Sequence, residues 1–129
     1  MSKLKIALEG GIFGLTDDDC INWRDYVIEK LGDKFEFHNP MDFDCRGKTV
    51  ELEQELVDYD EAGMQSSDVL LVNASTGGWG TAMAVQMAFD RNTPVLTVHP
   101  EEKISPWLNN RSTVVFKTLD EAIADLREW

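Results

Sequence analysis

The sequence lacks long hydrophobic runs, and no apolar stretch approaches the roughly 20 residues that a membrane-spanning helix needs. It begins "MSKLKIALEG", which goes directly into a strand-like pattern, so we expect no signal peptide. It has only two cysteines, Cys20 and Cys45, and their spacing is not that of a CxxC pair. Two thiols that need no pairing suit a reducing compartment, so a cytoplasmic location is expected.

Basic residues are also scarce. The chain has 12 Lys and Arg against 24 Asp and Glu, a formal net charge of −12. Proteins that grip duplex DNA through its backbone present a basic face, so a long nucleic acid is not expected as a partner. One arginine and a helix N-terminus can still hold a single phosphate, which keeps nucleosides and mononucleotides compatible with this charge.

What the sequence does contain is a regular alternation of short apolar runs and helical patterns over 129 residues, of which 43% are apolar. Strands are expected at residues 4–10, 34–40, 68–74, 93–100 and 112–117, with helices at residues 21–32, 49–65, 80–89 and from 118 onward. This alternation implies a parallel sheet covered by helices on both faces. We therefore predict an α/β protein with one domain over residues 1–129, a three-layer sandwich whose five-stranded parallel sheet has a flavodoxin-like, Rossmann-like order.

In such sheets, ligands bind beyond the carboxyl ends of the strands, where the strand order reverses. The loops expected at those ends read "GGIFGL", "NPMDFDCRGK", "NASTGGWG" and "HPEEKISPWLNN". They hold most of the Gly, Asn and Trp of the chain, so this edge of the sheet is the expected ligand site.

Asp60 is the most informative acid. Leu52, Leu56 and Met64 are spaced by four in their helix, and Asp60 completes the series. This places a carboxylate on the stripe that should face the core, where a charge is expensive unless it is paired or used. The alternative is that Asp60 lies at the edge of the stripe and caps a neighbouring loop.

The loop after the first strand is rich in glycine, although its spacing is not the GxGxxG fingerprint. Gly10 and Gly11 allow the backbone to approach a ligand closely, and Phe13, which follows Ile12, could stack on a flat ring. A tight turn with Phe13 in the core explains the same pattern equally well.

Other charged groups admit plain explanations. Arg24 and Arg46 lie near the loop face and could hold a phosphate, but each could equally form a surface ion pair. His38 and His99 have no metal-ligand neighbours and are interpreted as structural, and the run Asp17–Asp19 lacks the spacing of a calcium loop. We expect neither a metal nor a cofactor.

The stretch "GWGTAMAVQMAF" opens a helix whose N-terminal amides favour an anion. Gly80 and Thr81 begin this helix, and residue 84 lies one turn further, with its side chain leaning back towards the N-terminal end. A carboxylate at residue 84 would point into the expected ligand site, but the residue present is Ala84.

Taken together, these segments resemble the nucleoside 2-deoxyribosyltransferase-like family over nearly the whole chain. The segments that carry the resemblance are "NWRDYV", "NPMDFDCRGK", "VDYDEAGMQSSDVLLVN", "GTAMAVQMAF" followed by "TPV", and "SPWL". In that family the helix start reads Gly-Thr-Ala-x-Glu, and the glutamate is the catalytic nucleophile. The resemblance implies that Ala84 occupies the position of this nucleophile. Gly78 stands where many relatives have an aspartate, so recognition of the base should differ.

The resemblance implies a reaction in which the glutamate attacks C1′ of a 2′-deoxynucleoside and forms a deoxyribosyl ester, which a second base or water then resolves. Asp60 is implied to contact and protonate the departing base. Family sites are often completed by a neighbouring subunit, which implies a homodimer or larger assembly with Trp107, Asn109 and Asn110 acting in trans. The residues expected to contact the substrate are Gly10, Gly11, Ile12, Phe13, Trp23, Arg24, Asp44, Arg46, Asn73, Gly80, Thr81, Trp107, Asn109 and Asn110.

Three explanations of Ala84 are open. It is an engineered Glu→Ala change that leaves a substrate-binding but inactive enzyme, or the chain is a natural pseudoenzyme that binds a nucleotide for sensing or regulation. In the third, the mechanism has shifted to Asp44 or Glu9 as nucleophile.

A receiver or flavodoxin-like signalling domain is the rival from another class, because it shares the fold. Asn73 stands where a receiver needs its phosphoacceptor aspartate, "TVHP" offers no lysine, and "GGIFGL" is not the hydroxyl-rich loop of a flavodoxin. An absorbance test for bound flavin distinguishes this class.

Overall fold

The computed structural model describes residues 2–48 and 50–129. Its five parallel strands lie in the order β2-β1-β3-β4-β5, which is the predicted flavodoxin-like order. The strands are β1 (Leu4–Gly10), β2 (Phe35–His38), β3 (Val69–Asn73), β4 (Val95–Val98) and β5 (Val114–Phe116). The helices are α1 (Asp17–Leu31), α2 (Glu53–Gln65), α3 (Trp79–Asp90), α4 (Pro106–Arg111) and α5 (Leu119–Leu126), with short 3-10 helices at Pro40–Phe43 (η1) and Ala74–Thr76 (η2).

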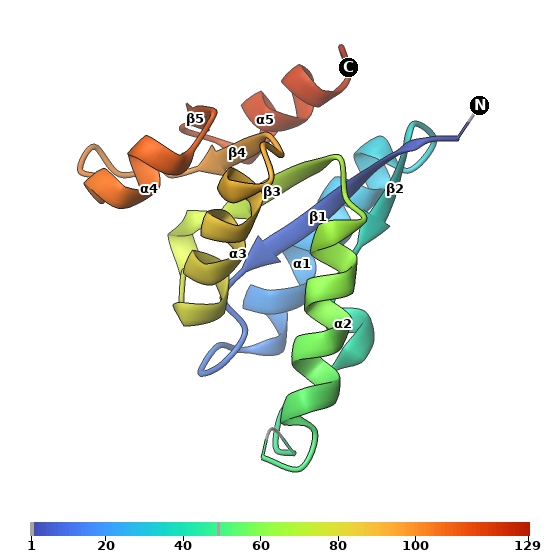
Figure 1. Ribbon diagram of the computed structural model, residues 1–129. Coiled ribbons are helices and arrows are strands. Elements are labelled where there is room, and N and C mark those ends of the chain that lie inside the picture. The colour runs from blue at the N-terminus through green and yellow to red at the C-terminus, as the bar shows by residue number, and fades with distance from the viewer. Residues whose placement is uncertain (1, 49) are drawn as a thin grey trace.

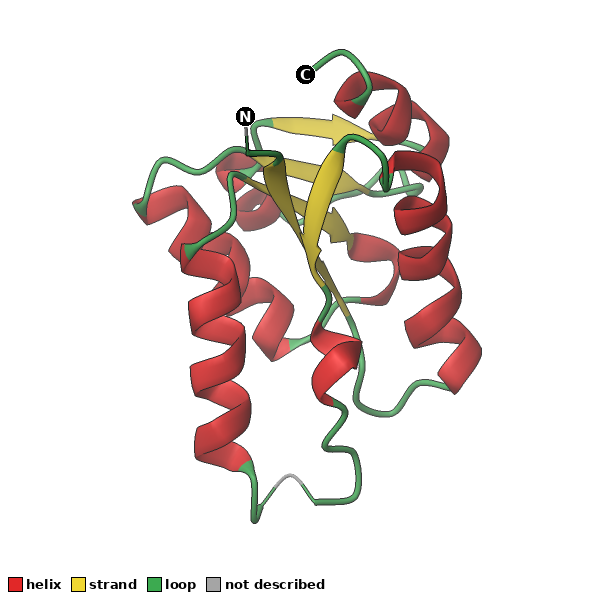
Figure 2. Cartoon of the chain, turned by 90° about the vertical axis from the view of Figure 1, so that its right-hand side faces the viewer, coloured by secondary structure: helices red, strands yellow, loops and turns green. Residues whose placement is uncertain are grey.

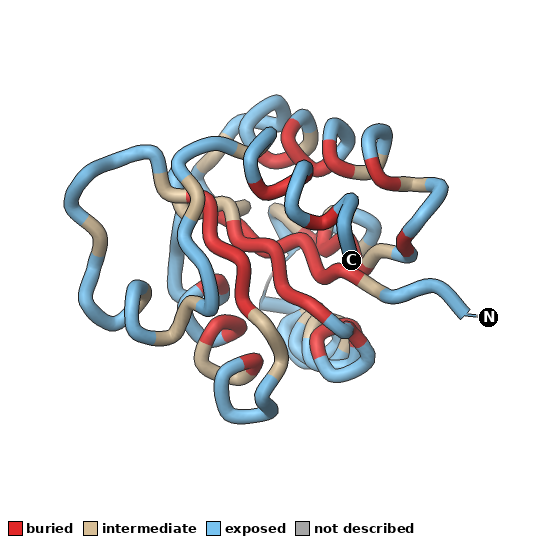
Figure 3. Tube along the Cα trace, turned by 90° about the horizontal axis from the view of Figure 1, so that it is seen from above, coloured by how far each residue is buried: buried red, intermediate tan, exposed pale blue. Residues whose placement is uncertain are grey.

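Helices cover both faces of the sheet (Figures 1 and 2), because the central strands are apolar on both sides. Alternate residues of β1 and β3 enter two separate cores, and Figure 3 shows the buried residues concentrated in the strands and on the inner sides of the helices. The first core lies under α1 and α5 and includes Ile6, Leu8, Trp23, Val27, Leu71 and Ile123. The second lies under α2 and α3 and includes Ala7, Met64, Leu70, Val72, Ala84, Val85 and Ala88.

The helix ends differ from expectation in two places. The cap of α1 is Thr16, whose side chain accepts a hydrogen bond from the Asp19 amide, so the three aspartates form the first turn. The carboxylates are favourable there because they face the positive end of the helix dipole. Helix α2 begins at Glu53, later than predicted; the predicted start at residue 49 lies outside the described residues.

The C-terminal helix was expected from residue 118 onward, and Thr118 caps it together with Glu121. The Thr118 hydroxyl accepts from the Glu121 amide at 3.2 Å and contacts the Glu121 carboxylate at 3.0 Å. Its inner stripe of Ala122, Ile123 and Leu126 is buried.

Helix α4 lies where the sequence predicted a loop. Its start at Pro106 fits the preference of proline for the first helical turn. No helix among residues 2–48 and 50–129 has the length and apolar character needed to cross a membrane.

Candidate functional site

The loops after β1 and β3 meet at the carboxyl edge of the sheet. The Gly11 amide donates a hydrogen bond to the Thr76 carbonyl, which ties the loop after β1 to η2. A Cβ atom at residue 11 would lie 2.6 Å from that carbonyl oxygen, so only glycine permits this approach. The close backbone approach predicted for the glycine-rich loop is therefore made, at Gly11, to the backbone of η2 and not to a ligand.

Asp60 reaches this edge from α2 and meets His38, the last residue of β2. Its Oδ1 lies 3.4 Å from Nε2 of His38, whose side chain is 4% exposed whereas that of Asp60 is 36% exposed. Gly63 lies above the imidazole, and a Cβ atom at that position would overlap the ring. The lack of a side chain at residue 63 therefore lets α2 approach β2 closely enough for Asp60 to reach His38.

Glu9 lies on β1 one residue before its end and is only 7% exposed. Burial and then repulsion from Asp60 raise the pKa of Glu9 to about 8, against the opposing attraction of Arg24. Glu9 therefore carries its proton at neutral pH, while Asp60 lies partly in solvent. The edge holds two acids in different environments, an arrangement typical of acid and base pairs in active sites.

Buried polar atoms without a hydrogen-bond partner gather at this edge. Among the described residues they are Glu9 Oε1, Trp23 Nε1, His38 Nε2, Asp60 Oδ1 and Thr76 Oγ1. Four of these residues lie at or near the ends of β1, β2 and β3 or on α2 against them. The ring of Trp23, on α1, lies beside Gly10, the last residue of β1. Buried polar groups are nearly always satisfied in folded proteins, so such a cluster is typical of a site that awaits a ligand or ordered water.

Arg24 has a structural position instead of the expected ligand contact. It is fully buried, and its guanidinium donates to the carbonyl oxygens of Leu8 at 3.2 Å, Gly10 at 3.2 Å and Cys20 at 2.7 Å. Strand β2 ends beside Ala7, so Leu8 and Gly10 extend past it and Arg24 supplies the donors that β2 does not. Burial lowers the pKa of Arg24, although Glu9 and other groups oppose this effect. We do not retain Arg24 as a phosphate ligand, because it is fully buried and each of its three nitrogens already donates to a backbone carbonyl oxygen.

Arg46 is held by two acids. Its Nε and Nη2 donate to the carboxylate of Asp44 at 2.9 and 2.8 Å, and Nη1 lies 2.8 Å from Oδ1 of Asp17. The Arg46 hydrogen bonds hold the pKa of Asp44 below its usual value. A phosphate would have to displace these carboxylates to reach Arg46.

Two recesses open near the edge. The small recess, of about 40 Å³, is lined by Ile12, Phe13, Pro40, Met41, Phe43, Asp44, Cys45, Arg46, Leu56 and Asp60. It brings together five of the predicted site residues, namely Ile12, Phe13, Asp44, Arg46 and Asp60. Phe13 is 62% exposed, so it is free to stack on a ligand and does not belong to the core.

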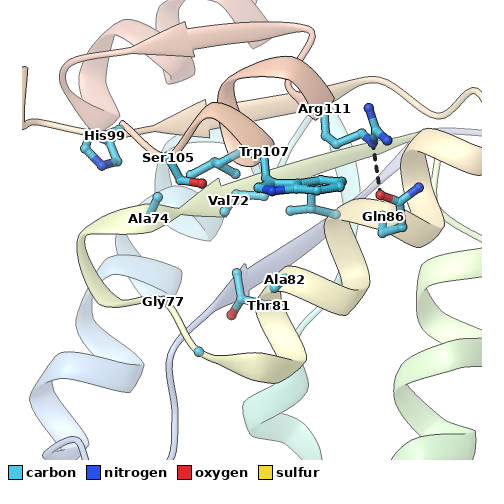
Figure 4. A pocket seen from close by; sticks show the side chains of 13 residues that line it. Val72, Ala74, Gly77, Thr81, Ala82, Gln86, His99, Ser105, Trp107 and Arg111 are labelled. Atoms are coloured by element: carbon cyan, nitrogen blue, oxygen red, sulfur yellow. Dashed lines mark hydrogen bonds between the residues drawn. The ribbon is translucent and has the colours of Figure 1, made fainter. Parts of the chain in front are cut away.

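The large recess, of about 420 Å³, lies between α3 and α4 (Figure 4). Trp107 and Arg111 line it from α4, Thr81 lines it from α3, and Arg111 donates to Gln86 at 2.9 Å. Its volume is that of a small-molecule site, but none of its described lining residues is an acid. The chemistry expected of Asp60 therefore belongs to the edge and the small recess, although the large recess offers more space.

Ala84 is 8% exposed and packs in the second core with Ala7, Met64 and Val85. It lines neither recess. We expected the side chain of residue 84 to face a cavity that is also lined by Asp60. Asp60 lines the small recess, but Ala84 does not. Ala84 does lie on the same side of the sheet as Glu9. Ala7 and Ala84 belong to the same core, and Glu9 follows Ala7 by two residues on β1, so both strand residues point to that side.

The remaining predicted residues have varied surroundings. Trp23 is 9% exposed, in the first core, and the Asn73 side chain caps η2 by accepting from the Ser75 amide at 3.2 Å. Gly80, Asn109 and Asn110 are exposed and line neither recess. Gly80, Asn109 and Asn110 therefore do not line a recess together with Asp60 within one chain.

The sequence contained only a weak indication that Glu9 and His38 belong to this site. It indicated Glu9 only as a substitute nucleophile and His38 only as a structural residue. The available signal was an acid near the end of the largely apolar strand "LKIALEG", on the face shared with Ala7. Within the described chain, no group of three or more His, Cys, Asp or Glu side chains has the arrangement of a metal site.

Comparison with known proteins shows the fold. No family model and no curated protein sequence matched the chain. A 2-deoxyribosyltransferase from Bacillus psychrosaccharolyticus superposes with a TM-score of 0.72 at 16% identity, over 97% of this chain and 91% of that one. A conserved protein from Enterococcus faecalis V583 superposes with a TM-score of 0.72 at 12% identity, over 98% and 99% of the two chains. The chain thus shares the α/β fold of a 2-deoxyribosyltransferase across its length.

Proposed function

We propose that the chain binds a 2′-deoxynucleoside or its 5′-monophosphate at the carboxyl edge of the sheet and turns it over negligibly. The observation that carries this proposal is the cluster of unpartnered polar atoms around Glu9, His38 and Asp60. The cluster lies at the edge where ligands of this fold class bind. The shared fold with a 2-deoxyribosyltransferase and the sequence resemblance indicate the ligand class.

The resemblance also explains why turnover should be negligible. In the related reaction a carboxylate oxygen forms a bond to C1′ while the C1′–N bond breaks, and its electron pair leaves with the base. Asp60 is the candidate to contact and protonate that base. Ala84 cannot form the ester, and loss of a nucleophile costs several orders of magnitude in rate. Ground-state contacts with the ligand persist, so binding survives.

A natural pseudoenzyme that senses or regulates through a bound nucleotide is the second candidate. The specific observation in its favour is the packing of Ala84, which is 8% exposed among apolar neighbours of the second core. A glutamate truncated in an open catalytic site would leave its methyl group beside a cavity. Ala84 instead fills its position as a core residue does.

A thermal-shift screen of deoxynucleosides and their monophosphates tests binding directly. A ligand that binds only the folded state raises the melting temperature according to its concentration over its affinity. Failure of every member of the screen to raise it would contradict the proposal.

Ala84→Glu tests the chemistry, with release or exchange of the base followed by chromatography and Ala82→Glu on the same helix as the matched control. If Ala84→Glu gains activity and the control does not, the inactivated-enzyme explanation is supported. If ligand binds but Ala84→Glu remains inert, the pseudoenzyme explanation is supported. Asp60→Asn added to an active Ala84→Glu variant should depress base departure more than sugar binding.

We also propose that the chain self-associates. Large apolar side chains are exposed on α3 and α4, with Trp79 86%, Met83 66% and Trp107 72% exposed. Exposed apolar patches of this kind are typical of protein interfaces. Asn109 and Asn110, exposed on the same short helix as Trp107, would then reach a neighbouring site. Sedimentation across concentrations tests this: Trp79→Ser should shift the chain towards monomer, whereas Trp129→Ser at the far end of the chain should not.

A further inference from the structure

Glu9 points to the α2 and α3 side of the sheet. Ile6 and Leu8 enter the first core and Ala7 enters the second, so the alternation of the strand turns Glu9 to the second side. Its register partner on β3 is Val72, also a second-core residue. Glu9 is therefore an acid at the end of an apolar face, directly before the Gly10–Gly11 loop.

Among residues 2–48 and 50–129, no basic side chain forms an ion pair with Glu9. Glu9 Oε1 is buried without a hydrogen-bond partner within the described residues. Arg24, the base that attracts it, donates instead to the carbonyl oxygens of Leu8, Gly10 and Cys20. A buried carboxylate without a partner is costly. Taking up a proton removes the cost of the charge, and a hydrogen-bond partner is still needed to offset the burial of the neutral carboxyl group.

The charged groups around Glu9 come from three elements. Asp60 on α2 repels its ionised form, Arg24 on α1 attracts it, and His38 at the end of β2 lies beyond Asp60, with Nε2 3.4 Å from Oδ1 of Asp60. Burial has the largest effect, and the pKa of Glu9 rises to about 8. At pH 7 the side chain is a neutral acid with one O–H donor.

We propose that Glu9 binds the ligand as a neutral carboxylic acid, donating a hydrogen bond from its carboxyl group to an uncharged acceptor atom of the nucleoside. The inference rests on the proposed function, because it assigns a contact within that site. The acceptor is a ring nitrogen, a carbonyl oxygen or a sugar oxygen. A phosphate does not fit this position, because Asp60 repels an anion here and Arg24 is fully buried against the carbonyl oxygens of the backbone. Glu9 is thus a specificity-determining residue, separate from the missing nucleophile at residue 84.

The test measures the affinity of 2′-deoxyadenosine and 2′-deoxycytidine by calorimetry at pH 7 and pH 9, since neither base changes charge in this range. Affinity for the unchanged chain should fall about tenfold between these values, because only the protonated fraction of Glu9 binds. Glu9→Gln keeps a donor of similar shape at every pH, so it should bind within about threefold of the unchanged chain at pH 7 and lose this pH dependence. Glu9→Ala should bind about tenfold more weakly at pH 7, as expected for loss of one hydrogen bond that leaves the ligand atom unpaired. Glu36→Gln, the same change at an exposed position of β2, is the matched control.

Infrared difference spectra between the unchanged chain and Glu9→Gln give a readout that needs no ligand. The protonated carboxyl band should persist through pH 7 and disappear on titration near pH 8, and its absence at pH 7 overturns the proposal. Binding that is equal in the unchanged chain and Glu9→Ala, or an unaltered pH dependence in Glu9→Gln, overturns the role of Glu9 alone. Absence of binding by the unchanged chain at pH 7, for these two and for every other deoxynucleoside and monophosphate of the screen, overturns the proposed function and this contact with it.

Discussion

Oδ1 of Asp60 lies 3.4 Å from Nε2 of His38, and both atoms are buried without a hydrogen bond among the described residues. The pair joins the middle of α2 to the end of β2, across the place where Gly63 leaves room for the imidazole. The ring of Tyr59 also packs against His38, with its centroid 5.1 Å from that of the imidazole. The orientation of Asp60 towards the site therefore depends on how closely α2 approaches the sheet.

Gly63→Ala should disrupt this approach. Alanine is the better helix former by about 1 kcal/mol, but its methyl group would overlap the His38 ring, and we expect a net loss of about 2 kcal/mol or more in the free energy of unfolding. Gly80→Ala on α3 is the control, since a Cβ there meets no atom within 4 Å, and it should be neutral or stabilising. Urea unfolding measures both, and equal effects of the two changes would contradict the close contact between α2 and His38.

Glu9→Gln should alter how stability depends on pH. The pKa of Glu9 is raised from 4.5 to about 8, so the folded state keeps a proton that the unfolded state loses between these values. The contribution of Glu9 is fully present below pH 4.5 and declines as pH rises to about 8, by up to about 1.4 kcal/mol per unit. The stability of Glu9→Gln minus that of the unchanged chain should therefore increase through this window and level off above it. Glu36→Gln should give a flat difference, and a flat difference for Glu9→Gln as well would contradict the burial of an unpaired acid.

Ala84→Glu should destabilise the chain as well as test its chemistry. A longer side chain at residue 84 must displace second-core residues and bring a carboxylate among them, which we expect to cost about 2 kcal/mol or more. Ala82→Glu lies in the exposed first turn of the same helix and should be neutral or slightly stabilising through the helix dipole. Thermal unfolding compares the two variants. Equal melting temperatures would show that open space lies beside residue 84, which would favour a truncated nucleophile over a natural core alanine.

Arg24→Met should be among the most destabilising single changes. It removes the donors to three carbonyl oxygens, those of Leu8, Gly10 and Cys20, and leaves them buried. We expect a loss of about 3–5 kcal/mol in the free energy of unfolding. Arg127→Met, at an exposed position after α5, should change it by no more than about 0.5 kcal/mol. A comparably small effect at residue 24 would return Arg24 to the set of residues free to bind a ligand.

The sequence predicted those features that depend on local order. The alternation of apolar runs with helical patterns led to the five parallel strands and their order. The position of Asp60 on the side of α2 that meets His38 also followed from its spacing with Met64, and its 36% exposed side chain lies at the edge of that side, as the alternative interpretation allowed. The apolar pattern of a strand repeats every two residues and that of a helix every 3.6 residues, so the pattern of residue types is enough to predict these elements.

The partners of the charged groups were decided only by the tertiary structure. Arg24 and Arg46 looked alike in sequence, yet one completes the edge of β1 beyond the end of β2 and the other is held by Asp17 and Asp44. The Asp60 carboxylate is close enough to repel an ionised Glu9, because Gly63 lets α2 pack closely against the end of β2. Which groups meet depends on strand lengths and on the distance between layers. These are set by packing between segments far apart in the chain, and no local pattern of residues records them.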